Sequence, residues 1–251
     1  MLDILWARLQ QKHRTIEFPD GPPPALSDRY QGRPAVFAEK CDPACSLCEQ
    51  VCPTGAVLRN PLGIDLGKCL FCGACAPLCP SRAIIFSNDY RVAESSRENL
   101  VVAAPERPAG QIVAAGAKRL FAKSLKLRQV SAGGCNACEA DTNVLGTVGW
   151  DLGRFGIQFV ASPRHADGLL ITGPVSENMR LALLKTYRAV PEPKVVILVG
   201  SCAISGGPFI DHEEVHNGAG GLLPVDLHIP GCPPSPLAIL DGLLRLTGRI
   251  S

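Results

Sequence analysis

Two stretches of cysteines with nearly the same spacing constrain the fold of this chain more than any other feature. The segment CSLCEQVCPTGAV at 45–57 aligns with CGACAPLCPSRAI at 72–84, and each includes a Cys-Pro pair. One more cysteine precedes each segment, Cys69 in the second copy and Cys41 in the first, where the spacing is one residue longer. Such short spacings place three thiols on one tight loop, so the duplication predicts two metal centres.

The spacing C-x2-C-x2-C-x3-C-P is that of bacterial ferredoxins, which hold two 4Fe–4S clusters. Three thiolates of one copy bind three irons of a cubane, and the Cys-Pro thiolate of the other copy reaches the fourth. Zinc also binds CxxC pairs, but it needs neither a third thiolate nor the two Cys-Pro tails. We therefore predict two 4Fe–4S clusters. Cluster 1 is assigned to Cys41, Cys45, Cys48 and Cys79, and cluster 2 to Cys52, Cys69, Cys72 and Cys75.

The composition favours metal ligation over export or nucleic-acid binding. Residues 1–14 lack the apolar core of a secretory signal, so we expect a cytoplasmic chain in which disulfides are rare. A net charge of +2 and an aromatic content of 5% give no support to a nucleic-acid partner. No apolar run approaches the roughly 18 residues of a membrane span.

The second half of the chain alternates strand-like apolar runs with helical patterns, which predicts an open parallel α/β sheet. The expected strands are 125–132, 167–173, 193–200 and 223–231, and the expected helices are 176–189 and 235–248. We place an N-terminal arm and a small ferredoxin domain at 1–90, a linker with a basic helix at 91–124, and the α/β domain at 125–251.

The four remaining cysteines all follow expected strands. Loops beyond the carboxyl ends of parallel strands meet at one edge of the sheet. We therefore predict a third 4Fe–4S cluster, cluster 3, on Cys135, Cys138, Cys202 and Cys232. The loop GSCAISGG could instead cradle a phosphate, but it lacks the Walker Lys-Ser/Thr. A thioredoxin-like pair at Cys135 and Cys138 would leave Cys202 and Cys232 unexplained.

The motifs GGCNACE, ASPRHADGLLITGPV, GSCAISGG and IPGCPPSP resemble the small subunit of membrane-associated (group 4) NiFe hydrogenases, especially of formate hydrogenlyase. They also resemble the homologous terminal-cluster subunit of complex I. The Cys135-x2-Cys138 spacing and His165 favour the hydrogenase type. YQGRPAV and FSNDYRV resemble the two-cluster ferredoxin subunit of the same complexes, so the chain looks like a fusion of two subunits. The resemblance implies a flavodoxin-like α/β domain.

The resemblance also implies partners and a location. These are a large catalytic subunit, membrane subunits, and an upstream electron donor such as a formate dehydrogenase or ferredoxin subunit. The chain would lie on the cytoplasmic face of the cell membrane. Three clusters use every cysteine, so no thiolate is left for nickel, and we expect the catalytic metal on another chain.

Several polar residues near the cysteines have two interpretations each. The resemblance implies a proton relay or an interface carboxylate for Glu139, whereas a structural role would be that of an acid at a helix N-terminus. Arg164 and His165 could meet acidic groups of a partner or fix their own loop. His228 could lie near cluster 3 or be buried by strand alternation.

Two surface features have similarly open interpretations. An N-terminal apolar stripe could dock on a membrane subunit or cover the core. Its residues are Leu2, Leu5, Trp6 and Leu9. A basic helix could meet anionic lipid or simply face solvent or a partner. Its charged residues are Lys118, Arg119, Lys123 and Lys126.

Three functions remain open from the sequence. The first is an electron-transfer subunit of a NiFe hydrogenase that evolves or oxidises H2. The second is the corresponding subunit of a complex I-like quinone oxidoreductase. The third is a free-standing polyferredoxin. The partner's sequence separates the first two, because two CxxC pairs for nickel would mark a hydrogenase.

Overall fold

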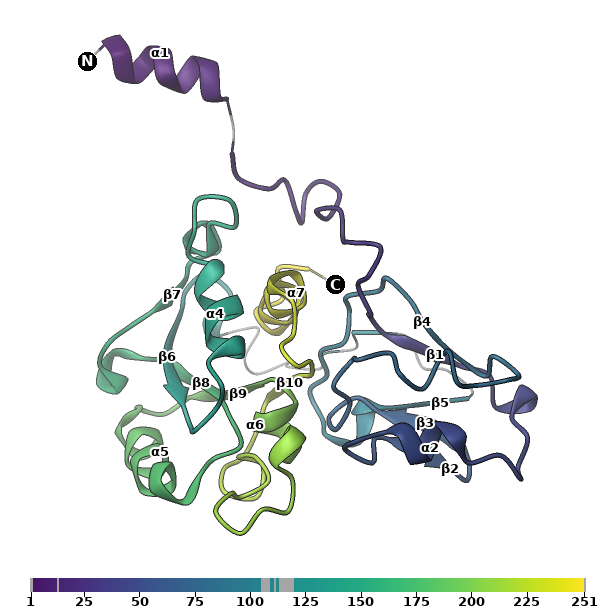
Figure 1. The fold of residues 1–251 in the computed structure, drawn as a ribbon. Helices are drawn as coiled ribbons and strands as arrows, with labels where there is room; N and C mark the ends of the chain where they lie inside the picture. The colour runs from purple at the N-terminus through teal and green to yellow at the C-terminus, as the bar shows by residue number, and fades with distance from the viewer. Residues whose placement is uncertain (1, 13, 105–108, 111, 113–119, 251) are drawn as a thin grey trace.

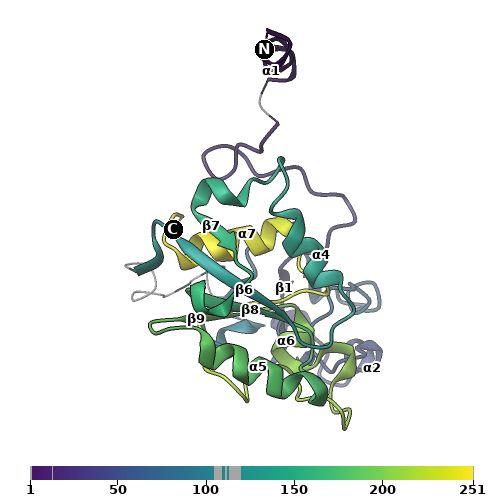
Figure 2. The ribbon, with the colours of Figure 1, turned by 90° about the vertical axis from the view of Figure 1, so that its left-hand side faces the viewer.

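The computed structural model describes residues 2–12, 14–104, 109–110, 112 and 120–250. Two units lie side by side, the cysteine-rich unit and the α/β unit (Figure 1). Helix α1 (Leu2–Gln11) projects away from both of them in Figure 1 and Figure 2. No helix in the described part of the chain is long and apolar enough to cross a membrane.

The cysteine-rich unit is built on two small antiparallel sheets, with the cysteines on the loops between strands. Strand β1 (Pro34–Val36) pairs with β4 (Ile84–Phe86). The second sheet has the order β2-β3-β5. Its strands are β2 (Val57–Arg59), β3 (Leu62–Asp65) and β5 (Val101–Ala103). Short helical turns connect them: η1 (Ala38–Lys40), α2 (Leu47–Val51) and η2 (Glu98–Leu100).

The segment expected as a linker is partly structured. Strand β5 lies within 91–124 and pairs with β3, so the sheet extends past the boundary proposed at residue 90. Glu94 exchanges two backbone hydrogen bonds with His228, at 2.9 and 3.0 Å, and so extends the edge of the α/β sheet. Most of the expected basic helix lies outside the described residues, including Lys118 and Arg119. Lys126 belongs to a strand and not to that helix.

The α/β unit has a five-stranded parallel sheet of order β10-β9-β8-β6-β7. Numbered within the unit this is 2-1-3-4-5, the flavodoxin-like order, so the predicted fold class is confirmed. All four expected strands are present, and β7 is an additional short one at the edge. The strands are β6 (Leu125–Ser131), β7 (Ile157–Phe159), β8 (Gly168–Thr172), β9 (Val195–Val199) and β10 (Leu227–Ile229).

Helices cover both faces of this sheet. Figure 2 shows α4 and α7 on one face and α5 and α6 on the other. They are α4 (Ala137–Val144), α5 (Glu177–Ala189), α6 (Ser201–Ser205) and α7 (Pro236–Leu246). Three short 3-10 turns are η3 (Leu152–Phe155), η4 (Pro163–His165) and η5 (Gly207–Phe209). Every residue of β8 and β9 is buried, as expected for central strands of a parallel sheet covered on both sides.

The hydrophobic core continues from one unit into the other. Ile64 and Leu100 of the cysteine-rich unit belong to the same buried cluster as Leu169, Leu183 and Leu198 of the α/β unit. A second cluster fills the opposite face of the sheet under α7. Helix α7 is well defined by its ends: Ser235 accepts a hydrogen bond from the Ala238 N–H at 3.2 Å, and Pro236 occupies the first turn.

Candidate metal centres

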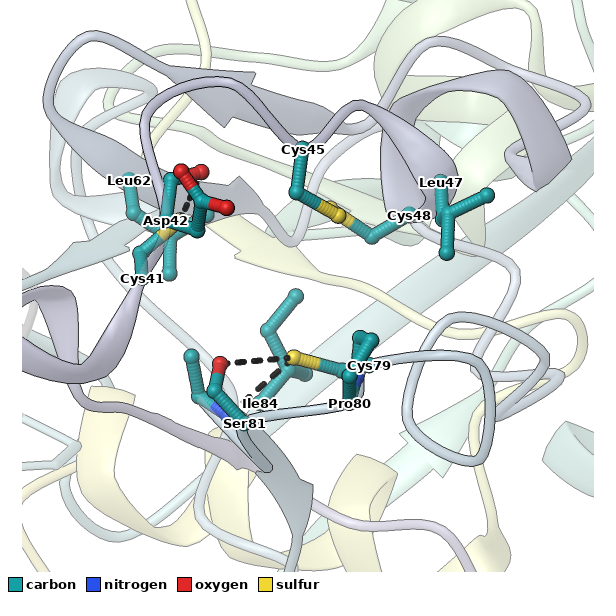
Figure 3. Close-up of a pocket in the computed structure, with 11 residues that line it drawn as sticks. Cys41, Asp42, Cys45, Leu47, Cys48, Leu62, Cys79, Pro80, Ser81 and Ile84 are labelled. Carbon is teal, nitrogen blue, oxygen red and sulfur yellow. Dashed lines mark hydrogen bonds between the residues drawn. The ribbon is translucent and has the colours of Figure 1, made fainter.

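The four cysteines assigned to cluster 1 line one pocket, together with apolar side chains such as Leu47 and Ile84. Figure 3 shows Cys41, Cys45 and Cys48 on one side of the opening and Cys79, next to Pro80, on the opposite side. The extra residue in the first copy therefore leaves Cys41 with the others. This is the arrangement of three thiols from one copy and one from the other that the spacing predicts.

The four cysteines assigned to cluster 2 line a second pocket, which Val51, Ala56 and Ile64 also border. The two copies have equivalent backbone contacts to sulfur. The Ala56 N–H donates to Cys52 Sγ at 3.2 Å, and the Ala83 N–H donates to Cys79 Sγ at 3.2 Å. The duplication in sequence is thus also a duplication in structure, because each Cys-Pro thiol accepts a hydrogen bond from the backbone N–H four residues further along the chain.

The cysteines assigned to cluster 3 lie at the carboxyl edge of the parallel sheet. Cys135 and Cys138 follow β6, Cys202 lies in α6 after β9, and Cys232 follows β10. Burial and the thiolates of Cys202, Cys232 and Cys135 raise the pKa of Cys138. Burial, Cys232 and Cys135 raise the pKa of Cys202 to about 12. The four groups are therefore close neighbours, although Cys135 and Cys232 are exposed and Cys202 is buried.

Glycines bring the backbone close to these sulfur atoms. Gly200 has φ +92°, and a Cβ atom there would lie 2.5 Å from Cys138 Sγ. A Cβ atom at Gly207, with φ +55°, would lie 2.8 Å from Cys202 Sγ. A side chain at either position would collide with a thiol and would also strain the backbone, so both positions require glycine.

The thiols of the cysteine-rich unit also influence one another within the predicted sets. Burial raises the pKa of Cys69 to about 12, and Cys75, Cys52 and Cys72 contribute to the increase. Burial raises the pKa of Cys48, as do Cys41 and Cys79. Cys72 also contributes to the raised pKa of Cys232, which places the second and third sets near each other. A thiol with a raised pKa is neutral at pH 7 until it binds a metal, so metal binding would release its proton.

Each set of cysteines supplies the donors that a 4Fe–4S cluster needs. Such a cluster is held by four cysteine thiolates. Each of the two pockets is lined by four cysteines, and the four cysteines at the sheet edge make a third set of the same size.

Glu139 is buried beside the cluster 3 cysteines, in the first turn of α4. Its carboxylate accepts a 2.6 Å hydrogen bond from Thr172 Oγ1, at the end of β8. Sequence reasoning missed Thr172, because a threonine that ends an apolar run looks like an ordinary strand residue. Glu139 also contributes to the raised pKa of Cys138, one of the cysteines assigned to cluster 3.

The other candidate residues do not line either of the two cysteine pockets. Arg164 and His165 are exposed in η4. His228 is buried, and burial lowers its pKa to about 4, as strand alternation implied. Leu5, Trp6 and Leu9 are exposed on α1, so the interpretation that they cover the core is wrong.

Comparisons with known proteins agree with both halves of this description. The family described as "NADH ubiquinone oxidoreductase, 20 Kd subunit" matches residues 135–246, and the 4Fe-4S binding domain matches 62–85. One NADH-quinone oxidoreductase subunit, from Clostridium beijerinckii, is 47% identical over 118 residues, which are 47% of this chain and 70% of that protein.

Two further relatives match similar parts of the chain. Formate hydrogenlyase subunit 7 of Escherichia coli is 44% identical over 51% of this chain, which spans half the length of that protein. A chain of the archaeal membrane-bound sulfane sulfur reductase is 36% identical with a TM-score of 0.46, over 52% of this chain and 72% of that one. The resemblance inferred from the motifs is confirmed. This chain belongs to the family of the 20 kDa subunit of NADH–ubiquinone oxidoreductase, iron–sulfur subunits of oxidoreductase complexes, and carries a 4Fe-4S binding domain before it.

Proposed function

We propose that this chain carries electrons through three 4Fe–4S clusters to or from a catalytic site on a large partner subunit. One observation carries the proposal: the twelve thiols form three sets of four, two around separate pockets and one at the edge of a parallel sheet. These are the sets assigned to clusters 1, 2 and 3.

The order of the sets along the molecule supports a path for electrons. Cys48 contributes to the raised pKa of Cys75, which links the first set to the second. Cys72 does the same for Cys232, which links the second set to the third. Cluster 3 is then the terminal cluster, next to the catalytic subunit, and cluster 1 lies towards the electron donor.

The reaction at the partner is a NiFe-dependent interconversion of protons and H2, in the manner of a formate hydrogenlyase. The Cys135-x2-Cys138 spacing and the match to formate hydrogenlyase subunit 7 support this choice. The second candidate is reduction of a quinone, which the 47% identical NADH-quinone oxidoreductase subunit supports. In both cases the catalytic metal or quinone site lies on the partner, and Glu139 serves as a proton relay or interface carboxylate beside cluster 3.

Exposed surfaces at opposite parts of the chain support the assembly. The edge that carries the exposed Cys135 and Cys232 docks on the large subunit and covers cluster 3. The exposed apolar residues of α1, among them Leu5 and Trp6, dock on membrane subunits. The chain then lies peripherally on the cytoplasmic face of the membrane, with the ferredoxin unit towards a formate dehydrogenase or ferredoxin-type donor.

Iron analysis of anaerobically purified chain tests the proposal. Three cubanes predict about twelve irons per chain, and spectra of the reduced protein should show three 4Fe–4S signals. Stoichiometric zinc with little iron would overturn the cluster assignment. An air-stable chain that holds all three clusters and co-purifies with no large subunit would instead support the free-standing polyferredoxin.

A further inference from the structure

Helix α6 lies at the junction between the second and third sets of thiols. It contains Cys202 and is buried along its whole length. On its other side lies the loop 67–69, which leads to Cys69. Two serines of α6, Ser201 and Ser205, stand four residues apart and so share one face of the helix.

Ser201 connects a ligand loop of each cluster. Its hydroxyl donates to the backbone carbonyl of Cys69 at 2.7 Å. Its backbone N–H donates to the carbonyl of Gly231 at 2.8 Å, directly before Cys232. The Ser201 hydroxyl also lies 3.0 Å from the Gly231 carbonyl, but that carbonyl already accepts the Ser201 N–H. The single hydroxyl proton is therefore available for the shorter bond to the Cys69 carbonyl. Ser201 is 1% exposed, so water does not compete for these bonds.

Ser205 makes a second bond across the same junction. Its hydroxyl donates to the carbonyl of Gly67 at 2.7 Å. The loop approaches α6 closely at this point, because a Cβ atom at Gly67 would lie 2.9 Å from Ile204 Cγ2. Asp65, two residues before Gly67, is itself fixed by Arg97. The Arg97 guanidinium donates hydrogen bonds of 2.8 and 2.6 Å to its two carboxylate oxygens.

We propose that Ser201 and Ser205 are positioning residues for electron transfer between clusters 2 and 3. This inference rests on the proposed function and adds a specific route to it. With both clusters bound, one electron would pass from the reduced cluster to the oxidised one, and no bond or proton would move. The serines fix the distance between the two ligand loops.

The route through Ser201 is nearly continuous. From Cys232 it passes along the backbone to the Gly231 carbonyl, across one hydrogen bond to the Ser201 N–H, through the side chain, and across a second hydrogen bond to the Cys69 carbonyl. Electron tunnelling weakens steeply across open gaps and much less along covalent bonds and short hydrogen bonds. Ser205 does not lie on this route and contributes by holding the loop.

The variants Ser201→Ala and Ser205→Ala test the roles separately in the full chain with its clusters. Neither removes a thiolate, so iron content and the individual cluster signals should remain. In the reduced protein, electron paramagnetic resonance should show a weaker spin–spin interaction between clusters 2 and 3, and the decrease should be larger for Ser201→Ala. Hydrogen–deuterium exchange of the amides at 67–69 should become faster in both variants.

The control is Thr247→Val, which removes a buried hydroxyl bonded to Leu243 within its own helix at 3.0 Å. It should keep the spin–spin interaction and the exchange rates of the wild type. An unchanged interaction in both serine variants, with wild-type clusters intact, overturns this inference alone. Loss of iron from cluster 2 or 3 in both variants also overturns it, because the serines would then support ligation. A wild-type chain that lacks these clusters overturns the proposed function as well.

Discussion

Gly200 shows how strongly a single backbone position limits the third site. Its φ of +92° and ψ of +152° lie in a region that side chains essentially never adopt, and the backbone there approaches Cys138 Sγ. The neighbouring glycine after α6, Gly207, has the same role beside Cys202. The third site therefore requires glycine at these two positions as well as its four cysteines.

The substitution Gly200→Ala should remove cluster 3 selectively. The methyl group would meet Cys138 Sγ, and the backbone strain would add about 1–3 kcal/mol. Iron per chain should fall by about four, while the two ferredoxin-type signals remain. The matched control is Gly220→Ala, because nothing lies within 4 Å of a Cβ atom there. Retention of a normal third signal in Gly200→Ala would contradict the assigned geometry.

At the scale of the elements, the pairing of Glu94 with β10 joins the two units. His228, at the centre of this pairing, is 5% exposed, and burial lowers its pKa to about 4. The side chain of Glu94, the residue that pairs with His228, also forms an ion pair with Arg33, and both side chains are only 4% exposed. The edge strand β10 is thus covered by a segment that comes from the cysteine-rich unit.

The variant His228→Gln should change how stability depends on pH. In the unfolded chain histidine titrates near 6.5, so between pH 6.5 and 4 the unfolded state binds the extra proton. His228 therefore contributes stability above pH 6.5 that is lost as the pH falls towards 4, on the order of 3 kcal/mol. Denaturant unfolding across this range should show a shallower decline for His228→Gln.

The exposed His212 provides the control for that measurement. The variant His212→Gln should keep the wild-type dependence of unfolding free energy on pH. Equal slopes for wild type and His228→Gln would show that His228 does not control this decline.

For the whole molecule, the exposed edge around Cys135 and Cys232 is the expected interface with the large subunit. Ala140 is exposed on α4, two residues after Cys138. The substitution Ala140→Arg adds a long charged side chain and removes no thiol. It should abolish co-purification of the large subunit while the isolated chain keeps all three clusters.

The same substitution on another helix is the matched control. Ala182 is exposed on α5, which covers the opposite face of the sheet from α4 (Figure 2). Ala182→Arg should leave co-purification at the wild-type level. If Ala140→Arg also leaves it unchanged, the interface lies elsewhere on the chain.

The sequence by itself determined the repeat, the family and the parallel sheet. Cysteine spacing and strand periodicity are local properties of the sequence. The cysteines from Cys41 to Cys79 could therefore be assigned to two clusters without coordinates, and the four main strands could be given residue ranges. Strand β7 was not predicted from the sequence because it has only three residues, two of which are exposed. The linker interpretation missed β5 because its partner β3 lies far away in the sequence.

Only the tertiary structure decided which groups meet across the chain. Thr172 reaches Glu139 from a different element, and Ser201 reaches Cys69 across 132 positions. Neither residue type nor local pattern encodes such a contact, because it depends on how two separately folded segments pack. Local sequence patterns therefore predict which cysteines group together, whereas contacts between separate segments, such as these two, arise only when the core closes.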